Sequence, residues 1–403
     1  MLTRPGNVRE WAVAIGGAAL VLASGSITPA DAIAALGREW DVFAFLLGLF
    51  GIAAIAEQSG IVERLTAAAH VHAGGRRDRL LVLICAVGAF VTVTLSNDAT
   101  VLILTPLVIA LCRALAIPAL PYAFACVLMA NAASLILPVA NPANVIVLHD
   151  APVRLGTYLA FAALPSLVAI VATTGALLVV FRGELRGPLA VPARAVVDPD
   201  AGIVGIGIGA VMVGYLVALA VGWPVGLVAL TGAVLLVLLR AARRRLDVRR
   251  YLSGIEWAVF PFLAGLFILV SAAERAGLGP VVATAVAEGE GAGAPGTAGL
   301  AIAAAAASNL MNNLPFALVA GEGLRAAPAA GPAAVVALLV GIDLGPSFTT
   351  IGSLATLIWI LILRRRGIAL SALGYMRLAL LPALAALVGA TLALAAVTAL
   401  SQR

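Results

Sequence analysis

Apolar segments long enough to cross a lipid bilayer recur from one end of this 403-residue chain to the other. A helix needs roughly 17–25 mostly apolar residues to span the hydrocarbon core. Charged residues make up only 11% of the sequence, whereas an ordinary soluble domain carries about 25%. The sequence therefore predicts an all-α polytopic membrane protein with about 9–11 transmembrane helices.

An internal repeat organises these apolar segments. Residues 39–50 read EWDVFAFLLGLF and residues 256–267 read EWAVFPFLAGLF, so nine of twelve positions match at an offset of 217. The same offset pairs Glu57 with Glu274 and Gly60 with Gly277. Self-similarity at a fixed period indicates one structural unit used twice.

The repeat also assigns the first apolar segment. With Arg4 and Arg9 in front of it, this segment resembles a cleavable signal peptide. Subtracting 217 from the apolar segment 228–239 gives residues 11–22, which fall in the same segment. We therefore expect it to be retained as the first helix of the first repeat.

The distribution of basic residues predicts the orientation, because cytoplasmic loops of membrane proteins carry an excess of basic residues. All 25 basic residues are Arg, and they cluster between spans, so the net charge of +6 is an orientation signal and predicts no nucleic-acid partner. The segment 72–79 is basic, whereas the equivalent segment 287–296 is acidic. The repeats are therefore predicted to have inverted topology, with 72–79, 240–250, 364–366 and the N-terminus on the cytoplasmic side of a bacterial plasma (inner) membrane.

We expect three regions in the chain. They are repeat 1 (1–181), a cytoplasmic linker with a connecting helix (182–222) and repeat 2 (223–403). Continuous spans are expected near 11–25, 41–58, 156–181, 203–222, 224–240, 256–274 and 371–398. Re-entrant hairpins are expected at 80–113 and 298–321, and helices broken near the midplane at 122–148 and 332–363.

Polar residues interrupt the hairpins and the broken helices at matched places. Because non-helical backbone at membrane depth is tolerated only against protein or a watery cavity, these interruptions are expected to meet in one pocket for a small polar solute. The predicted substrate-binding residues are Ser96, Asn97, Asn141, Asn144, Asn312, Asn313, Thr349, Gly352 and Ser353. A simpler interpretation of each one is a hydrogen bond between neighbouring helices.

Two carboxylates lie among these interruptions, Asp98 and Asp343. A charged residue at the centre of a membrane helix costs roughly 2.5–3.5 kcal/mol on insertion scales, so its presence indicates a function. Both are predicted to couple transport to protons. No metal site and no cofactor are expected, and the three Cys are expected to be small buried hydrophobes.

The chain resembles the arsenite-efflux permease family, the membrane subunit of arsenical pumps, within a superfamily of inverted-repeat ion transporters. The resemblance rests on SNDATVLILTPLVIAL (96–111), NAASLILPVANPANVIV (131–147), NLMNNLPFALVAG (309–321) and GIDLGPSFTTIGSLATLIW (341–359). The sequence departs from the family where Thr350 replaces a frequent Pro and where Asn-Pro-Ala-Asn stands at 141–144.

The resemblance implies secondary active export of arsenite or antimonite by proton antiport, with an elevator-like motion of the hairpin-bearing core. It also implies a dimeric scaffold and, in some members, a cytoplasmic ATPase partner. This sequence contains no Gly-rich phosphate loop, so we expect no ATP hydrolysis and no enzymatic activity by the chain itself. A sodium/proton or small organic-anion carrier of the same superfamily is the alternative, followed by a channel or an intramembrane enzyme.

Overall fold

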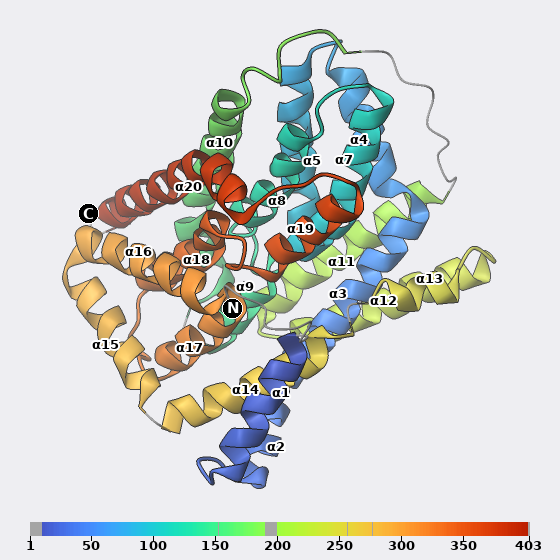
Figure 1. Ribbon diagram of the computed structural model, residues 1–403. Coiled ribbons are helices and arrows are strands. Elements are labelled where there is room, and N and C mark those ends of the chain that lie inside the picture. The colour runs from blue at the N-terminus through green and yellow to red at the C-terminus, as the bar shows by residue number, and fades with distance from the viewer. Residues whose placement is uncertain (1–9, 152, 190–199, 256, 276, 402–403) are drawn as a thin grey trace.

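The computed structural model describes residues 10–151, 153–189, 200–255, 257–275 and 277–401, so the expectation for the N-terminal residues lies outside the described part. Within these ranges the chain consists of helices and turns, with one isolated β-bridge (Figure 1). Six described helices are long and apolar enough to cross a membrane, and they are Trp40–Ser59, Asn97–Ala114, Leu155–Val180, Ala201–Ala218, Val225–Ala242 and Ala372–Ser401. The prediction of an all-α membrane chain is confirmed.

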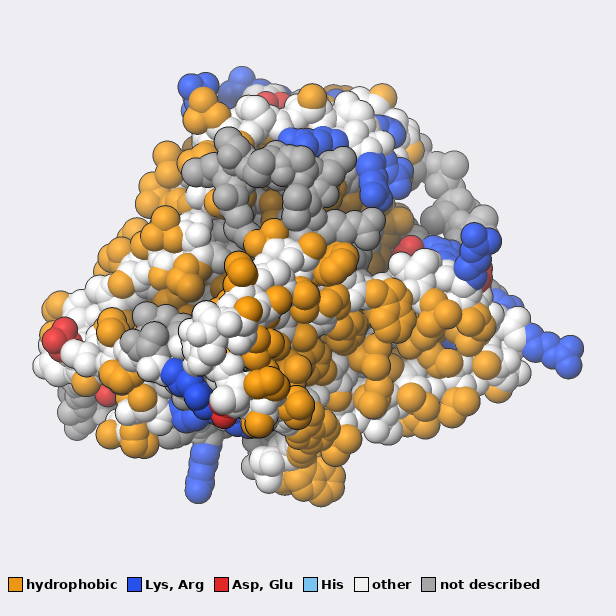
Figure 2. Space-filling view, turned by 60° about the horizontal axis from the view of Figure 1, so that its bottom comes forward, with side chains coloured by type: hydrophobic (Ala, Val, Ile, Leu, Met, Phe, Trp, Pro, Cys, Tyr) orange, Lys and Arg blue, Asp and Glu red, His pale blue; other side chains and the backbone are white. Residues whose placement is uncertain are grey.

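The surface of the molecule carries the large apolar side chains that lipid contact requires. Leu20, Ile206 and Leu392 are among the residues exposed over more than 60% of their area. Figure 2 shows hydrophobic side chains over much of one face, with the charged side chains mostly toward its edges. Such an apolar surface is stable in hydrocarbon and would drive association in water.

Four helices form contacts between the two repeats. The helices are α1 (Glu10–Ala23), α3 (Trp40–Ser59), α12 (Val225–Ala242) and α14 (Val259–Arg275). Helix α3 packs against α12, and α14 packs against α1. A Cβ on Gly48 would lie 2.2 Å from the Ala229 carbonyl carbon, and one on Gly265 would lie 2.6 Å from that of Ala14. Since Gly48 and Gly265 are 217 residues apart, both repeats use the same backbone-to-backbone contact.

Four short or amphipathic helices were not predicted from the sequence. They are α2 (Pro29–Arg38), α4 (Ile61–His72), α13 (Val248–Ser253) and α15 (Leu278–Gly291). Helices α4 and α15 follow α3 and α14 through equivalent glycines, Gly60 (φ 67°) and Gly277 (φ 89°). A left-handed glycine turns the chain within one residue. Helix α15 begins directly after this turn and continues to Gly291, and α16 begins at Gly293. The segment 287–296, which we expected to be a loop, is therefore mostly helical.

Each repeat contains two helical arms that meet at a polar break. In the first repeat the arms are α5 (Arg77–Thr94) and a composite arm of α6 (Asn97–Ala99), the π-helical turn η1 (Thr100–Leu104) and α7 (Thr105–Ala114). In the second repeat they are α16 (Gly293–Met311) and α17 (Asn313–Arg325). The breaks fall at Leu95–Ser96 and at Asn312, where the sequence placed the hairpin tips.

A broken helix follows each pair of arms. The first consists of α8 (Leu120–Ala132), the 3₁₀ turn η2 (Pro138–Ala140) and α9 (Pro142–Asp150). The second consists of α18 (Pro332–Leu344), the 3₁₀ turn η3 (Gly345–Phe348) and α19 (Leu354–Arg365). Helix α5 packs against α8, and α16 packs against α18. The arms and the broken helices therefore form one packed unit, which we call the core.

Two long helices end the repeats, α10 (Leu155–Val180) and α20 (Ala372–Ser401), and α11 (Ala201–Val221) connects the halves. Helices α10 and α20 pack against each other. Tyr158 and Tyr375 lie 217 residues apart, as do the internal prolines Pro165 and Pro382. The Tyr158 hydroxyl donates to the Leu135 carbonyl and the Tyr375 hydroxyl to that of Ser347, so each tyrosine ties a long helix to a break in the core.

The contact of α3 with α12 can be tested by adding one methyl group. In Gly48→Ala the new Cβ would overlap the backbone of α12, so we expect a loss of about 1–3 kcal/mol of stability. Gly209→Ala is the control, because a Cβ there has nothing within 4 Å. Thermal unfolding in detergent measures both. Equal midpoints for the two variants would contradict the packing.

Candidate functional site

Four helical segments begin at the breaks, and each begins with a polar N-cap. The Ser96 hydroxyl accepts from the Ala99 amide (3.1 Å), and the Asn141 side chain accepts from Ala143 (3.0 Å). In the second repeat, Asn312 accepts from the Leu314 amide (3.3 Å) and Ser353 accepts from Thr356 (3.1 Å). The first amides of a helix have no partner within it, so each side chain satisfies a donor that hydrocarbon could not.

The N-terminal residues of these four segments surround one cavity. The cavity is lined by Leu46, Asn97, Asp98, Asn141, Pro142, Val259, Asn313, Leu314 and Ser353. Seven of these belong to the core, while Leu46 comes from α3 and Val259 from α14. The free volume of the cavity is about 20 Å³, slightly more than the ~10–15 Å³ that one water requires. We call this the central pocket.

The electrostatics of the central pocket come from helix ends and one carboxylate. A helix N-terminus carries a partial positive charge, equivalent to roughly half an elementary charge, and the ends of four segments point here. Asp98 lies at the start of the segment Asn97–Ala114, and its amide donates to the Asn97 side chain (2.8 Å). The lining residues include amides, a hydroxyl and a carboxylate but no Arg. This arrangement suits a small solute rich in oxygen.

Asp343 lies behind the central pocket, in a contact between the repeats. Its two carboxylate oxygens accept from the side-chain amides of Asn141 (2.6 Å) and Asn144 (2.9 Å). The Asn144 amide also donates to the Ser134 carbonyl (3.1 Å). Asp343 is 1% exposed. Two donors on two oxygens are the partners that an ionised carboxylate requires.

Asn144 leaves one group unsatisfied. Its side-chain oxygen is buried and has no hydrogen-bond partner among the described residues. A protonated Asp343 would carry an O–H donor, and rotation of the Asn144 amide would offer this oxygen to it. This rotation would break the bond of Asn144 to the Ser134 carbonyl, so the hydrogen bonds of this contact depend on the protonation state of Asp343.

The second hairpin is fixed against the second broken helix by side-chain amides. Asn309 donates to the Gly345 carbonyl (2.6 Å) and accepts from the Thr349 hydroxyl (2.8 Å). The Asn312 side chain donates to the Ile351 carbonyl (3.0 Å), and the backbone N–H of Asn313 donates to the Gly352 carbonyl (2.9 Å). These bonds hold the tip of the hairpin at the second break.

Gly352 is required at the second break because there is no space for a side chain, since a Cβ would lie 2.6 Å from the Cα of Pro346.

The structure brings five of the residues expected from the sequence into the central pocket, namely Asn97, Asp98, Asn141, Asn313 and Ser353. The others surround it as caps, spacers and hydrogen-bond partners, and these are Ser96, Asn144, Asn312, Asp343, Thr349 and Gly352.

Sequence reasoning missed the apolar lining and several supporting groups. The missed lining residues are Leu46, Pro142, Val259 and Leu314, and the missed supporting residues are Asn131, Ser134, Tyr158, Asn309, Ser347 and Tyr375. A signal existed for the tyrosines, which share the repeat offset of 217. For Leu46 and Val259 nothing set them apart from the other apolar residues of the repeated segments 39–50 and 256–267.

The described residues contain no cluster of three or more His, Cys, Asp or Glu that could hold a metal ion. Cys85, Cys112 and Cys126 are buried and unpaired, and they are absent from the lining of the central pocket.

Comparisons with known proteins assign the family. Residues 1–342 match the family model described as citrate transporter. The arsenical pump membrane protein of Escherichia coli (strain K12) is 31% identical over 376 residues, covering 90% of this chain and 87% of that protein. That of Yersinia enterocolitica is 33% identical with the same coverage. An uncharacterized transporter of Mycobacterium tuberculosis is 30% identical over 391 residues, covering 91% and 88%.

A solved transporter structure has a similar fold. The crystal structure of the Alcanivorax borkumensis YdaH transporter, described as having an unusual topology, aligns with a TM-score of 0.61. The alignment covers 98% of this chain and 99% of that one at 14% sequence identity, so the likeness is one of fold. It supports the architecture of two inverted repeats.

The contact of Asp343 with Asn144 can be tested by a double-mutant cycle. Asn144→Leu removes a donor from a buried carboxylate and should cost about 1.5–3 kcal/mol. Asn144→Leu combined with Asp343→Leu should cost less than the sum of the single changes, because the two groups contact each other. Thermal unfolding in detergent provides the values. Thr398→Val is the control, because the Thr398 hydroxyl bonds within its own helix. Its cost in stability should add to that of Asn144→Leu without coupling. Strict additivity in both pairs would refute the contact.

Proposed function

The chain belongs to the citrate transporter family and is a homologue of the arsenical pump membrane proteins, and from this premise we propose that it exports arsenite or antimonite across the plasma membrane. Membership of this family and the apolar helices make it a multi-pass membrane transporter. The observation that carries the proposal is the central pocket, where amides and a carboxylate meet the N-termini of four helical segments.

The chemistry of the pocket supports a neutral solute with several hydroxyl groups. Near neutral pH arsenite is an uncharged trihydroxy acid, whose oxygens can accept from amides and whose hydroxyls can donate. Asn97, Asn141 and Asn313 supply both donors and acceptors, and Asp98 supplies acceptors. The pocket is thus equipped for hydrogen bonds of both senses without a compensating charge on the solute.

Proton antiport is the coupling that we propose. Expelling a neutral solute against its gradient requires coupling to a downhill process, and the inward flow of protons provides one. Asp98 lines the pocket and Asp343 lies behind Asn141, so protonation of either carboxylate changes the hydrogen bonds of a residue at the pocket. Solute and proton would then compete for the same polar groups.

The size and position of the pocket support alternating access. The space open in this state is that of about one water, so a larger solute requires the walls to separate. Leu46 and Val259 form one wall, and the breaks of the core form the other. We propose that the core slides along α3 and α14 in an elevator-like motion, opening the pocket to each face in turn.

A carrier for sodium or small organic anions is the second candidate. The matching family model is described as citrate transporter, and helix N-termini attract anions. The lining of the central pocket offers no Arg to pair with several carboxylates. Arsenite is therefore the preferred solute, and citrate and sodium belong in the same assay.

Transport of the solute is tested in an arsenite-sensitive bacterial strain that lacks its own pump. Expression of the chain should lower cellular arsenic and restore growth, and Asn313→Leu, which places a branched apolar group in the pocket, should abolish both. Protein in the membrane is confirmed by immunoblotting. Unchanged arsenic content with the native chain present, together with uptake of labelled citrate in vesicles, would replace this proposal by the second candidate.

The proposed proton carriers are tested in inverted vesicles over a range of pH. Asp98→Asn and Asp343→Asn should lose accumulation driven by a proton gradient while retaining downhill exchange of arsenite, because an amide cannot take up the proton. Asp78→Asn is the matched control, since Asp78 forms an exposed ion pair with Arg76. Full proton-driven accumulation in both variants would exclude these two carboxylates as carriers.

A further inference from the structure

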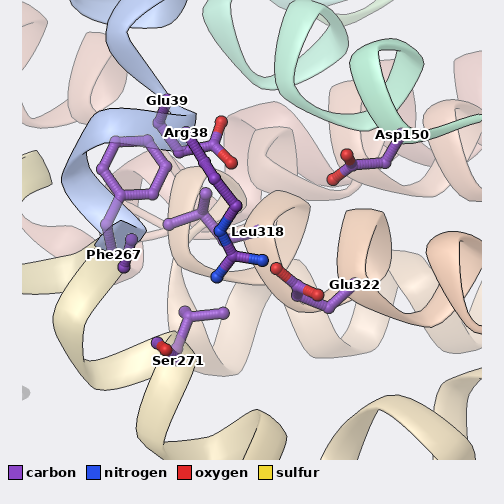
Figure 3. Close-up of a pocket in the computed structure, with 9 residues that line it drawn as sticks. Arg38, Glu39, Asp150, Phe267, Ser271, Leu318 and Glu322 are labelled. Atoms are coloured by element: carbon purple, nitrogen blue, oxygen red, sulfur yellow. The ribbon is translucent and has the colours of Figure 1, made fainter. Parts of the chain in front are cut away.

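A second cavity lies between the core and the helices that cross between the repeats. It is lined by Ala35, Arg38, Glu39, Asp150, Phe267, Val270, Ser271, Leu318 and Glu322 (Figure 3). Arg38 and Glu39 stand where α2 meets α3, whereas Asp150 ends α9 and Glu322 lies on α17. The scaffold, by which we mean α1, α2, α3, α12 and α14, thus contributes one side chain of each sign, and the core contributes two carboxylates. We call this the charged cluster.

The charged cluster and the central pocket lie on the same helices. Helix α9 begins at the central pocket with Pro142 and ends at the cluster with Asp150. Helix α17 contributes Leu314 to the pocket and Glu322 to the cluster. Eight helical residues span about 12 Å at 1.5 Å each. The cluster is therefore about 12 Å beyond the pocket along both helices, at the outer end of the contact between core and scaffold.

Arg325, at the end of α17, joins the carboxylates of the cluster. Its guanidinium contacts one oxygen of Asp150 through Nη2 (2.5 Å) and Nε (3.1 Å). It also bonds Glu322 (2.8 Å) and lies 3.6 Å from Glu39. Asp150 and Glu322 belong to the core, whereas Glu39 begins α3. One guanidinium thus bridges the two bodies, and a planar group with five donors suits this task better than Lys.

A second charged side chain, Arg38, extends across the boundary in the opposite sense (Figure 3). Figure 3 shows the Arg38 guanidinium extending from the end of α2 toward the Glu322 carboxylate of the core. Acidic and basic groups therefore alternate across the boundary, with Glu39 facing Arg325 and Arg38 facing Glu322. Phe267 and Leu318 provide apolar walls beside them. Sliding of the core along α3 must separate Arg325 from Glu39 and move Glu322 away from Arg38 (Figure 3).

The burial of the cluster makes its separation costly but reversible. The side chains of Glu39 and Asp150 are 9% exposed, whereas that of Arg325 is 33% exposed. Partly buried ion pairs are screened by salt much less than exposed ones. Unlike interlocked apolar side chains, these groups regain hydration when they separate. Such a contact can close and reopen during each transport cycle.

We propose that Arg325 is the positioning residue of an ion-pair gate that closes the central pocket toward the face on which Glu39 lies. The gate rests on the proposed alternating access and extends it by assigning the residues that hold one state. By the distribution of Arg, this face is the outer one. Loss of the gate leaves the pocket open outward for a larger share of the cycle.

Thiol accessibility tests the gate without any solute. Leu46→Cys places a reporter in the central pocket, and the three native Cys are buried. A membrane-impermeant maleimide is applied outside right-side-out vesicles. Arg325→Gln should raise the labelling rate of the reporter by about tenfold, within the usual range of coupling between sites. Arg325→Lys, which keeps the charge, should restore most of the protection.

Two further variants separate the gate from a folding defect. Glu39→Gln removes the bridge to the scaffold and leaves Arg325 bonded to Asp150, so it should raise labelling even if Arg325→Gln folds poorly. Arg76→Gln breaks an exposed ion pair elsewhere and should leave labelling unchanged. Unchanged labelling in both Arg325→Gln and Glu39→Gln, with native unfolding midpoints, would overturn the gate.

The transport assay distinguishes failure of the gate from failure of the proposed function. If the native chain moves arsenite, Arg325→Gln should lower the maximal rate of export with little change in the solute concentration at half-maximal rate, because no gate residue lines the central pocket. If the native chain moves no arsenite, the proposed function fails while the labelling result still decides on the gate. A raised half-saturating concentration at unchanged maximal rate would contradict a positioning role.

Discussion

The need to satisfy backbone groups within an apolar interior governs this structure. Four helical segments begin in the middle of the molecule, where bulk water is not available to their first backbone N–H groups. Ser96, Asn141, Asn312 and Ser353 satisfy them locally. The caps oblige the four ends to gather where other polar groups can lie, since lipid tolerates none of them. The central pocket is the result of this gathering, and its partial positive charge comes with it.

Much of the core was predictable, because its breaks are visible against an apolar background. Asn, Ser and Pro within an otherwise uniform apolar run are costly, so Ser96-Asn97-Asp98 and Asn312-Asn313 marked the tips of both hairpins. Helices α4 and α15 were not predictable in the same way. The repeat offset pairs Gly60 with Gly277 but does not say what backbone conformation they adopt, and only their positive φ reveals a turn that replaces a loop.

The particular contacts between the repeats were beyond the sequence, because it predicts that the interruptions meet in one pocket but not which side chains bond to each other. The offset pairs Asp98 with the region of Asn313, and both line the central pocket. It gives no hint that Asp343 of the second repeat accepts from Asn141 and Asn144 of the first. That contact joins the Asp343 carboxylate to the first broken helix. The two halves of the core therefore cannot move independently, since separating them would leave a buried carboxylate without donors.

The repeats close their two outer ends by related but unequal means. In each, the second arm of the hairpin carries an Arg at its end that bonds the end of a broken helix from the other repeat. Arg325 binds the Asp150 carboxylate, whereas Arg113 donates to the Arg366 carbonyl. A carbonyl carries no charge that could pair with another ion, whereas a carboxylate carries one. Arg325 also lies within ion-pair distance of Glu39 on the scaffold. An inverted repeat thus provides the same geometry on both faces, and a few side chains make one of them sensitive to the position of the core.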